Sequence, residues 1–212
     1  MSWFTRKTYP NFYNAYAEMF KHQSKTVETT RFVVFDTETT GLNPKTDTIL
    51  SIGCVAIFDN KINVVDSFEV YLNQAQFNAD TVQIHGILKS GSITKIEERD
   101  AIIQFLDYIK NAVLVAHHAA FDMAMINQAL KRLDLPKLKN KVIDTGQLYK
   151  KTKYVKDNKH YSLDALCKQF NITMHDRHTA SGDAYLTALV FLKCCGLLKT
   201  KKKRGFRLRD LF

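Results

Sequence analysis

Three apolar stretches in the first third of the chain decide the fold: RFVVFDT at residues 31–37, TILSIGCVAIF at 48–58 and INVVDSFEVYL at 62–72. Their β-branched and aromatic residues favour strands, and the polar turn Asp59-Asn60-Lys61 separates the second from the third. Short links join neighbouring strands in the antiparallel sense. The sequence therefore predicts an antiparallel meander of three strands.

The rest of the chain alternates helical and extended patterns. Apolar residues recur at helical spacing in residues 94–110, whereas the run AVLVA at 112–116 is typical of a buried strand. A short strand at 141–144 and helices at 121–133, 162–170 and 179–198 complete the pattern. A meander followed by βαβ units predicts an α/β domain: a mixed sheet in a three-layer arrangement, with helices on both faces.

Composition divides the chain into three parts. Residues 1–30 are rich in aromatic side chains, three of which follow Pro10 at helical spacing and predict an amphipathic extension. We expect this extension to pack on the main domain, with partner docking as the alternative. The main domain is expected at 31–198, and 199–212 form a basic tail, KTKKKRGFRLRDLF, that is too short to fold alone.

The charge balance favours a polyanionic partner. Thirty-one Lys and Arg against 21 Asp and Glu leave a net charge of +10, which suits nucleic acid or an anionic membrane. We expect a cytoplasmic protein without a membrane span, because no run approaches the roughly 20 apolar residues required and the start lacks a signal peptide's apolar stretch. The cysteines, which include no C-x-x-C pair, are expected to be reduced and mostly buried: Cys54, Cys167, Cys194 and Cys195.

A pair of carboxylates stands where the first predicted strand leaves the core. Asp36 and Glu38 lie at i and i+2, so their side chains project from the same face of the sheet. Two hard oxygen ligands on one face favour a divalent cation, whereas a solvated strand end is the alternative. Ligand sites are common at the ends of buried strands, which favours the metal interpretation.

Two further carboxylates stand near predicted helix starts. Asp122 follows the buried run AVLVA, and Asp183 falls in the first turn of the last long helix. Acidic residues are also stabilising at helix N-termini without any other role. His178 lies five residues before Asp183 in a predicted loop, where an imidazole is free to approach the acidic groups.

The segments FDTETTGL (35–42), VAHHAAFD (115–122) and HTASGD (178–183) together resemble the three exonuclease motifs of the DEDD superfamily. The spacing H-x-x-x-x-D resembles the histidine branch of that superfamily, and the chain looks similar to the epsilon proofreading subunits of bacterial DNA polymerase III. The resemblance extends from about residue 31 to residue 195 and implies a ribonuclease H-like fold. It also implies a 3′→5′ exonuclease that releases nucleoside 5′-monophosphates.

The same resemblance implies roles for individual residues. Two divalent cations, Mg²⁺ or Mn²⁺, would clamp the attacking and leaving oxygens of the phosphodiester. His178 would serve as the general base, since an imidazole titrates near neutral pH, and Thr39 and Leu42 would lie against the terminal nucleotide. The metal ligands that it implies, also catalytic, are Asp36, Glu38, Asp122 and Asp183.

Three functions remain open at this point. The first is a DNA exonuclease in proofreading or repair, and the second is an RNA-trimming exonuclease with the same chemistry. The third is a nucleic-acid-binding protein that keeps the fold without catalysis. His118 replaces an Asn that is frequent in relatives, which leaves the role of that position open.

Two basic segments suggest partners. Lysines interleaved with tyrosines in residues 137–161 suit binding of a single strand or, alternatively, form a solvated surface. The terminal RLRDLF (207–212) faintly resembles peptides that bind the sliding clamp, which makes a clamp or a DNA polymerase a possible partner of the tail. A frayed tail is the alternative.

Overall fold

A computed structural model describes residues 8–21, 26–76, 78–152, 154, 160–201 and 206–212. In this part of the chain the strands form one five-stranded sheet in the order β3-β2-β1-β4-β5. The neighbours of β1 differ in direction, because β2 runs antiparallel to it and β4 parallel. The fold prediction is thus confirmed for strands β1 Phe32–Thr39, β2 Ile49–Phe58, β3 Lys61–Tyr71, β4 Val113–Ala116 and β5 Val142–Asp144.

The predicted hairpin between β2 and β3 is a two-residue turn. Phe58 pairs with Lys61, and the two residues between them, Asp59 and Asn60, have φ angles of 48° and 57°. Positive φ at both central residues fits the right-handed twist of the flanking strands, and Asp and Asn tolerate it better than most residues. This turn sets the register of the pairs next to it, Phe58–Lys61 to Ala56–Asn63, and the β2–β3 pairing shifts between Val55 and Ala56.

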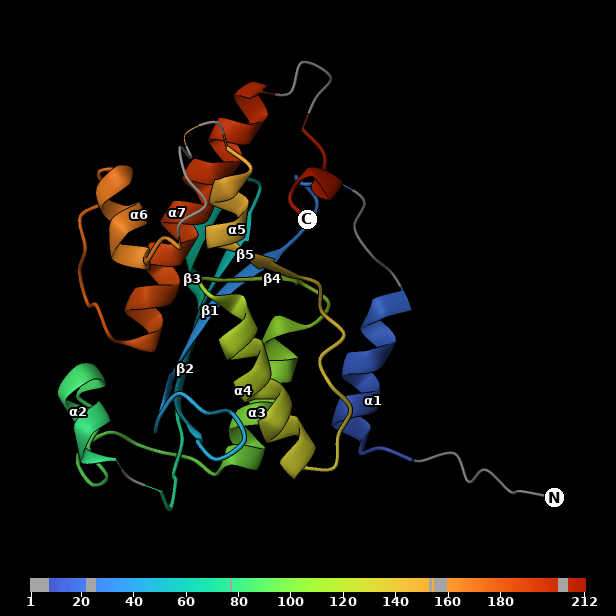
Figure 1. Cartoon of the computed structure of the whole chain (residues 1–212). Coiled ribbons are helices and arrows are strands. Elements are labelled where there is room, and N and C mark those ends of the chain that lie inside the picture. Colours follow the sequence, from blue (N-terminus) through green and yellow to red (C-terminus); the bar gives the residue numbers. More distant parts are fainter. Residues whose placement is uncertain (1–7, 22–25, 77, 153, 155–159, 202–205) are drawn as a thin grey trace.

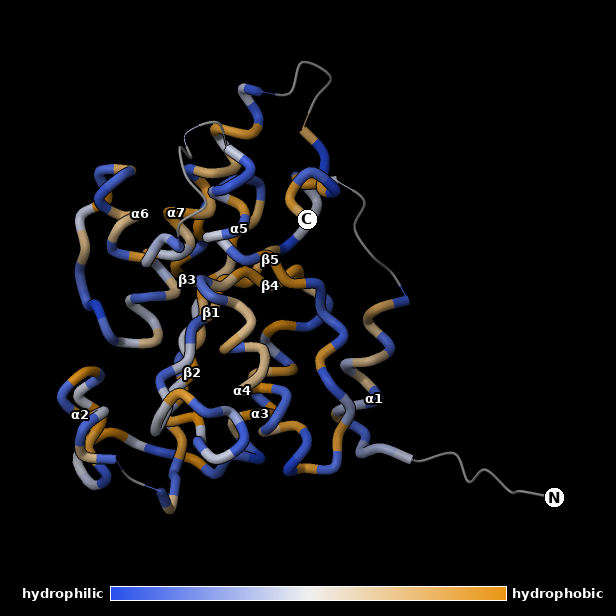
Figure 2. The backbone as a smooth tube through the Cα atoms, viewed as in Figure 1, coloured by the Kyte–Doolittle hydropathy of each residue, from blue (hydrophilic) through white to orange (hydrophobic). Residues whose placement is uncertain are grey.

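Helices cover both faces of the sheet (Figure 1). Alternate β1 residues point to opposite sides, so Val33 and Phe35 join one core cluster and Phe32 and Val34 join the other. The strands carry the apolar centre of the molecule, as the hydropathy colouring in Figure 2 shows. The first cluster includes residues of α1 Asn11–Glu18, α3 Glu98–Ile109 and α4 Ala119–Arg132, and the second includes residues of α5 Thr145–Lys150, α6 Leu163–Gln169 and α7 Ala180–Lys201.

Two helices differ from the sequence-based expectation. The helix expected from residue 94 begins at Glu98, because Ile96 forms a bridge beside Leu72 and exchanges backbone hydrogen bonds with Tyr71 and Asn73. Helix α2, Ala79–His85, was not predicted. Its sequence ADTVQIH carries little apolar periodicity, and α2 depends on its caps, the Asn78 side chain at one end and Gly86 with φ 68° at the other.

The amphipathic helix predicted after Pro10 is α1, followed by the short 3₁₀ turn Met19–Lys21. Its most buried side chains are Tyr13 and Tyr16, each 2% exposed. The Tyr16 hydroxyl donates to Asn140 Oδ1 at 2.6 Å and accepts from the backbone of Lys139 at 2.8 Å. These contacts attach α1 to the segment that leads into β5. Residues 1–7 and 22–25 of the expected extension lie outside the described residues.

The end of the basic tail packs on the domain. After the undescribed residues 202–205, a 3₁₀ turn spans Leu208–Asp210, and the Asp210 carboxylate accepts from the backbone of Arg207 at 2.9 Å. Leu211 is 2% exposed and belongs to the core cluster of α5, α6 and α7. The tip is therefore not a frayed end, and binding of a clamp through Leu211 would require its release.

Helix α7 is the core helix of its layer. Within the described residues α7 alone is long and apolar enough to cross a membrane, judged by length and composition. By that criterion the prediction that no stretch of the sequence approaches the length of a membrane span is wrong. The apolar window is 61% buried inside the protein, however, and α7 packs along β1 and β2. The predicted state of the cysteines is confirmed, since all four are free and buried.

Candidate active site

Three carboxylates from β1 and α7 meet at one end of the sheet. Asp36, Glu38 and Asp183 each offer an oxygen, and these atoms lie within 4.8 Å of one another. Asp36 and Glu38 share the face of β1 that α7 covers, as their i and i+2 spacing predicts. Asp183 joins them from the first turn of α7.

A glycine in β2 lets the start of α7 come this close. A Cβ built on Gly53 would lie 2.2 Å from the carbonyl carbon of Ala180 and 2.2 Å from the nitrogen of Ser181. Both neighbours are backbone atoms, which cannot rotate away, so any side chain here would push the helix off the strand. Gly53 pairs with Asp36 across the sheet, which places this contact next to the carboxylates.

Asp122 lies beside the group of three but is held separately. β1 pairs with β4 at Phe32–Val34, so the backbone of Thr37 extends beyond the paired region of that edge. The Thr37 N–H donates to Asp122 Oδ1 at 3.0 Å, and the Thr37 hydroxyl donates to the same oxygen at 2.7 Å. Asp122 is 3% exposed. Because the Thr37 side chain points to the face of β1 opposite to that of Asp36 and Glu38, Asp122 adjoins this pair from the opposite face. Thr37, which positions it, was missed from the sequence.

Burial is the main reason why the pKa values of Asp36, Glu38 and Asp122 are raised. Burial, and then the charges of Asp122, Asp183 and Glu38, raise the pKa of Asp36 well above its ordinary value. Burial, followed by the neighbouring carboxylates, raises the pKa of Glu38 to about 7. Burial also raises the pKa of Asp122 to about 7, although the Thr37 hydrogen bonds oppose that rise. Such a site favours a positive charge.

The donor set fits a hard divalent cation. Carboxylate oxygens are the ligands that Mg²⁺ and Mn²⁺ prefer. The Asp183 Oδ1 atom is buried and has no hydrogen-bond partner among the described residues, which leaves an acceptor aimed into the site. The structure thus brings together three of the four expected ligands, with Asp122 alongside.

An arginine that the sequence analysis passed over pairs with this cluster. Arg177 forms an ion pair with Asp183 through Nη1 and donates to Asp164 of α6 through Nε at 2.6 Å. Its charge lowers the pKa of Asp36 and of Glu38, against the larger effects that raise them. The available signal was its position directly before His178, the first residue of the third motif.

His178 lies in the loop that leads into α7. Its side chain is exposed and its backbone φ is 63°, an uncommon value for a residue other than glycine. Among the contacts of the described residues, none joins its ring to the carboxylates. The role of general base stays a prediction.

The two expected substrate contacts differ in exposure. Thr39 is buried and its hydroxyl donates to the Gly41 carbonyl at 2.7 Å. Leu42 is 86% exposed at the tip of the loop between β1 and β2. Asp47 accepts from the Thr40 hydroxyl at 3.2 Å and from the backbone of Asn43 at 2.8 Å, so hydrogen bonds on both sides of Leu42 hold the loop together while its apolar side chain stays in solvent.

The histidines of the second motif contact other side chains. The His117 ring shares a hydrogen bond with the Thr145 hydroxyl at 2.8 Å, and burial lowers the pKa of His117 to about 4. His118 begins α4 with a φ of 62°, and its ring stacks on His160 with centroids 4.0 Å apart. Neither histidine belongs to the carboxylate group among the described residues.

His85 and Asp144 have structural roles. His85 Nδ1 accepts from the backbone of Ile87 at 3.0 Å. Asp144 caps α5 by accepting from Gln147 N at 2.9 Å, and it also accepts from Ala119 N at 2.8 Å. Asp144 thereby joins the starts of two helices at the same edge of the sheet.

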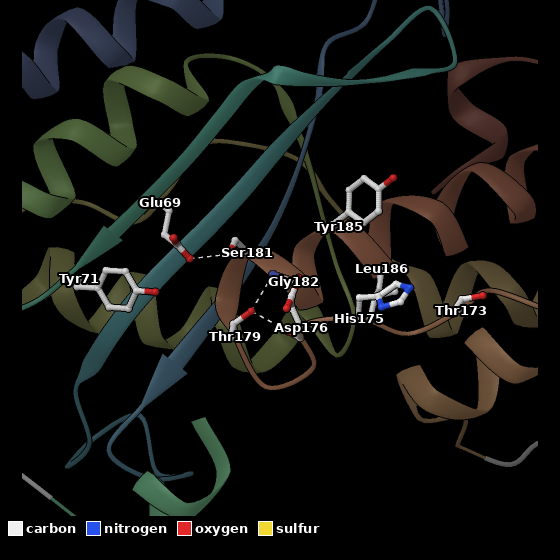
Figure 3. A pocket seen from close by; sticks show the side chains of 10 residues that line it. All are labelled: Glu69, Tyr71, Thr173, His175, Asp176, Thr179, Ser181, Gly182, Tyr185 and Leu186. Atoms are coloured by element: carbon white, nitrogen blue, oxygen red, sulfur yellow. Dashed lines mark hydrogen bonds between the residues drawn. The ribbon is translucent and has the colours of Figure 1, made fainter. Parts of the chain in front are cut away.

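A cavity of about 460 Å³ opens between β3 and the first turn of α7 (Figure 3). Glu69 and Tyr71 of β3 line one side, and the Ser181 hydroxyl donates to Glu69 across it at 2.5 Å. Thr179 and Gly182 line the other side. Ser51 pairs with Glu38 on one side and with Tyr71 on the other, and Gly182 directly precedes Asp183, so the cavity adjoins the acidic site.

Fold and site together define a class. A mixed five-stranded sheet with a cluster of carboxylates contributed by its central strand and by a flanking helix is a ribonuclease H-like arrangement. The exonuclease family model matches residues 33–191. The chain belongs to the exonuclease family, within the DEDD superfamily of 3′→5′ exonucleases.

Sequence relatives are PolC-type DNA polymerase III chains. The chain is 34% identical over 186 residues to that of Bacillus subtilis (strain 168), which covers 87% of this chain and 12% of the relative. It is 39% identical over 163 residues to that of Caldanaerobacter subterraneus subsp. tengcongensis, covering 76% and 11%. The chain therefore spans about an eighth of the length of these relatives, which are PolC-type chains rather than the epsilon subunits that the motifs resemble.

Solved structures share the fold. Exonuclease X in complex with 5′ overhanging duplex DNA superposes with a TM-score of 0.64 at 23% identity, over 85% of this chain and 96% of that one. E. coli Exonuclease I in complex with a dT13 oligonucleotide gives a TM-score of 0.68 at 14% identity, over 82% and 42%. At these identities the likeness establishes the architecture alone.

Proposed function

We propose that this chain is a metal-dependent 3′→5′ exonuclease that removes nucleotides from the end of DNA and releases nucleoside 5′-monophosphates. The observation that carries the proposal is the meeting of Asp36, Glu38 and Asp183 within 4.8 Å, beside the buried Asp122. Residues 31–198 form the catalytic domain in this proposal, with residues 1–30 and 199–212 as extensions that pack on it or bind partners.

Asp36, Glu38, Asp122 and Asp183 would hold two divalent cations, Mg²⁺ or Mn²⁺. When bound, the cations supply positive charge that neutralises the phosphodiester as it is cleaved. The carboxylates are fixed in advance by β1, by Thr37 and by the close contact of α7 with Gly53. Little reorganisation is then needed when a strand arrives.

His178 would act as the general base that accepts a proton from the attacking water. Its position in an exposed loop next to α7 lets the ring turn toward the site, and hydrogen bonds of catalytic groups commonly tighten only when substrate binds. Thr39 and Leu42 would contact the terminal nucleotide, with the exposed Leu42 side chain against its base.

DNA is the proposed substrate because the relatives are named as DNA polymerases and the two solved structures contain DNA. The net charge of +10 suits either nucleic acid, however. A proofreading role beside a polymerase follows from the relatives, and an RNA-trimming exonuclease remains the alternative.

The test is release of mononucleotides from labelled single-stranded DNA and RNA of the same sequence, with Mg²⁺, with Mn²⁺ and with a chelator. Asp36→Ala and Asp183→Asn remove ligands, and His178→Ala removes the base. Asp107→Asn, an exposed acidic residue of α3 outside the acidic site, is the matched control. A second substrate pair, with matched and mismatched 3′ ends, tests proofreading.

We expect a metal-dependent ladder on DNA that both ligand variants abolish and the control retains. His178→Ala should slow the reaction roughly 10²–10⁴-fold and remove one limb of its pH profile. Digestion of RNA in preference to DNA would favour the trimming alternative. A folded protein that releases nothing from either strand would leave only a non-catalytic binding role.

A further inference from the structure

One positively charged side chain lies against the carboxylate cluster. Arg177, in the loop between α6 and α7, forms an ion pair with Asp183, and its side chain is only 22% exposed. Arginine keeps its proton at any physiological pH, so this is a permanent positive charge. It pairs with Asp183 Oδ2, on the same carboxylate whose Oδ1 atom has no hydrogen-bond partner in the described part of the chain.

The same guanidinium has a second partner outside the cluster. Its Nε donates to Asp164 at 2.6 Å, near the start of α6. The Asp164 side chain is 54% exposed and does not belong to the group of three carboxylates in the described part of the chain. Arg177 is therefore shared between an inner carboxylate and an outer one.

We propose that Arg177 is a resident counter-ion of the acidic site, which pairs with Asp183 while no metal is bound and passes to Asp164 when a divalent cation takes Asp183. This inference rests on the proposed metal-dependent function. It assigns a positioning role to a residue outside the ligand set.

Two physical arguments support the exchange. A divalent cation on Oδ1 and a guanidinium on Oδ2 of the same carboxylate repel each other at short range, so they compete for the Asp183 charge. Asp164 gives Arg177 a carboxylate to keep when Asp183 is taken, so the displaced charge stays paired. The chain can thus hold its acidic cluster together before metal arrives.

The exchange also concerns His178, the next residue. Arg177 links the loop to both α6 and α7 through its two ion pairs. Loss of the ion pair with Asp183 would detach the loop from α7 at the residue next to the proposed base. Metal binding and the placement of His178 are coupled in this arrangement.

The experiment measures Mn²⁺ affinity by calorimetry or by electron paramagnetic resonance, without substrate. Arg177→Gln removes the competitor and should bind Mn²⁺ about tenfold more tightly, the equivalent of one partly buried charged hydrogen bond. In a chelator the same variant should melt lower than the wild type, by roughly 3 °C or more. Saturating Mn²⁺ should remove that deficit.

Matched variants separate competition from general electrostatics. Lys168→Gln, on the exposed face of α6, removes the same charge without touching a ligand and should change the affinity little. Asp164→Asn withdraws the outer partner and should weaken Mn²⁺ binding, because Arg177 then depends on Asp183 alone. Asp176→Asn, an exposed neighbour that forms none of the ion pairs described for Arg177, should weaken it much less.

The outcomes distinguish the two proposals. A wild type that binds no Mn²⁺ refutes the metal-dependent function together with this inference. A wild type that binds Mn²⁺ normally while Arg177→Gln binds no more tightly overturns the inference alone. Equal effects of Asp164→Asn and Asp176→Asn overturn it as well, even if Arg177→Gln cannot be folded.

Discussion

Stripping divalent cations from this protein should make its stability fall as the pH rises through the neutral range. The perturbation acts on Glu38, whose pKa is raised from 4.5 to about 7 by burial and by neighbouring carboxylates. Ionising that side chain in the folded, metal-free protein then costs about 3 kcal/mol relative to the unfolded chain. For a protein of this size that corresponds to roughly 6–12 °C in melting temperature.

The sign follows from the proton balance. Below pH 4.5 Glu38 is protonated in both the folded and the unfolded chain, so its contribution is fully present. Between that value and about 7 the folded chain keeps a proton that the unfolded chain has lost, and stability falls with rising pH. His117 acts in the opposite direction, because burial lowers its pKa to about 4 and acid must charge it on unfolding.

The assay therefore compares the wild type with Glu38→Gln, which keeps His117, removes the Glu38 titration and also takes one neighbouring charge away from Asp36. Melting temperatures in a chelator should diverge as the pH rises from 5 to 8.5 in steps, with the variant falling less. Mn²⁺ should restore the wild type at high pH and help the variant little. Parallel pH curves for the two proteins in chelator would refute the reasoning, as would a wild type that gains stability over the variant at high pH.

Three further predictions concern two residues that support the site and one that anchors the tail. Gly53→Ala should lower the free energy of unfolding in urea by about 3 kcal/mol, because the new methyl group would lie 2.2 Å from backbone atoms of α7. The control Gly196→Ala in α7, where a Cβ would have nothing within 4 Å, should raise it by about 0.5–1 kcal/mol. Thr37→Val removes the hydroxyl that donates to Asp122 and should weaken Mn²⁺ binding roughly tenfold, measured by calorimetry, with circular dichroism unchanged. Leu211→Ala should cost about 2–3 kcal/mol in urea unfolding, and a tail variant as stable as the wild type would show that the tip contributes nothing.

The fold was largely predictable because its strong signals are local. Apolar alternation and a polar two-residue turn defined the meander, and the helical periods of α4, α6 and α7 were correct to within a few residues. Helix α2 was missed because caps rather than periodicity define it. The start of α3 was misplaced because Ile96 pairs with Leu72, a contact between residues 24 positions apart that no short window contains.

Side-chain pairing at the site was less accessible. The i and i+2 spacing of Asp36 and Glu38 was sufficient to place them on one face, since strand geometry fixes it. The donation from Thr37 to Asp122 depends on where β4 stops pairing with β1, which is a property of the assembled sheet. Arg177 was overlooked because its position directly before the third motif does not show which carboxylates it pairs with, and those partners are defined only by the assembled fold.

The position of the site follows from strand direction. β1, β4 and β5 run parallel, so their carboxyl ends lie at the same end of the sheet. The last residues of β1, which include Glu38, and the first turn of α4, which follows β4, come together there. β2 returns antiparallel from this edge, and a glycine in its middle admits the start of α7. Carboxylates that are 147 residues apart in the chain, Asp36 and Asp183, meet because one strand is buried on both faces and a helix crosses its end. Any change that tilts α7 away from Gly53 should therefore separate Asp183 from β1 while leaving Asp122 in place.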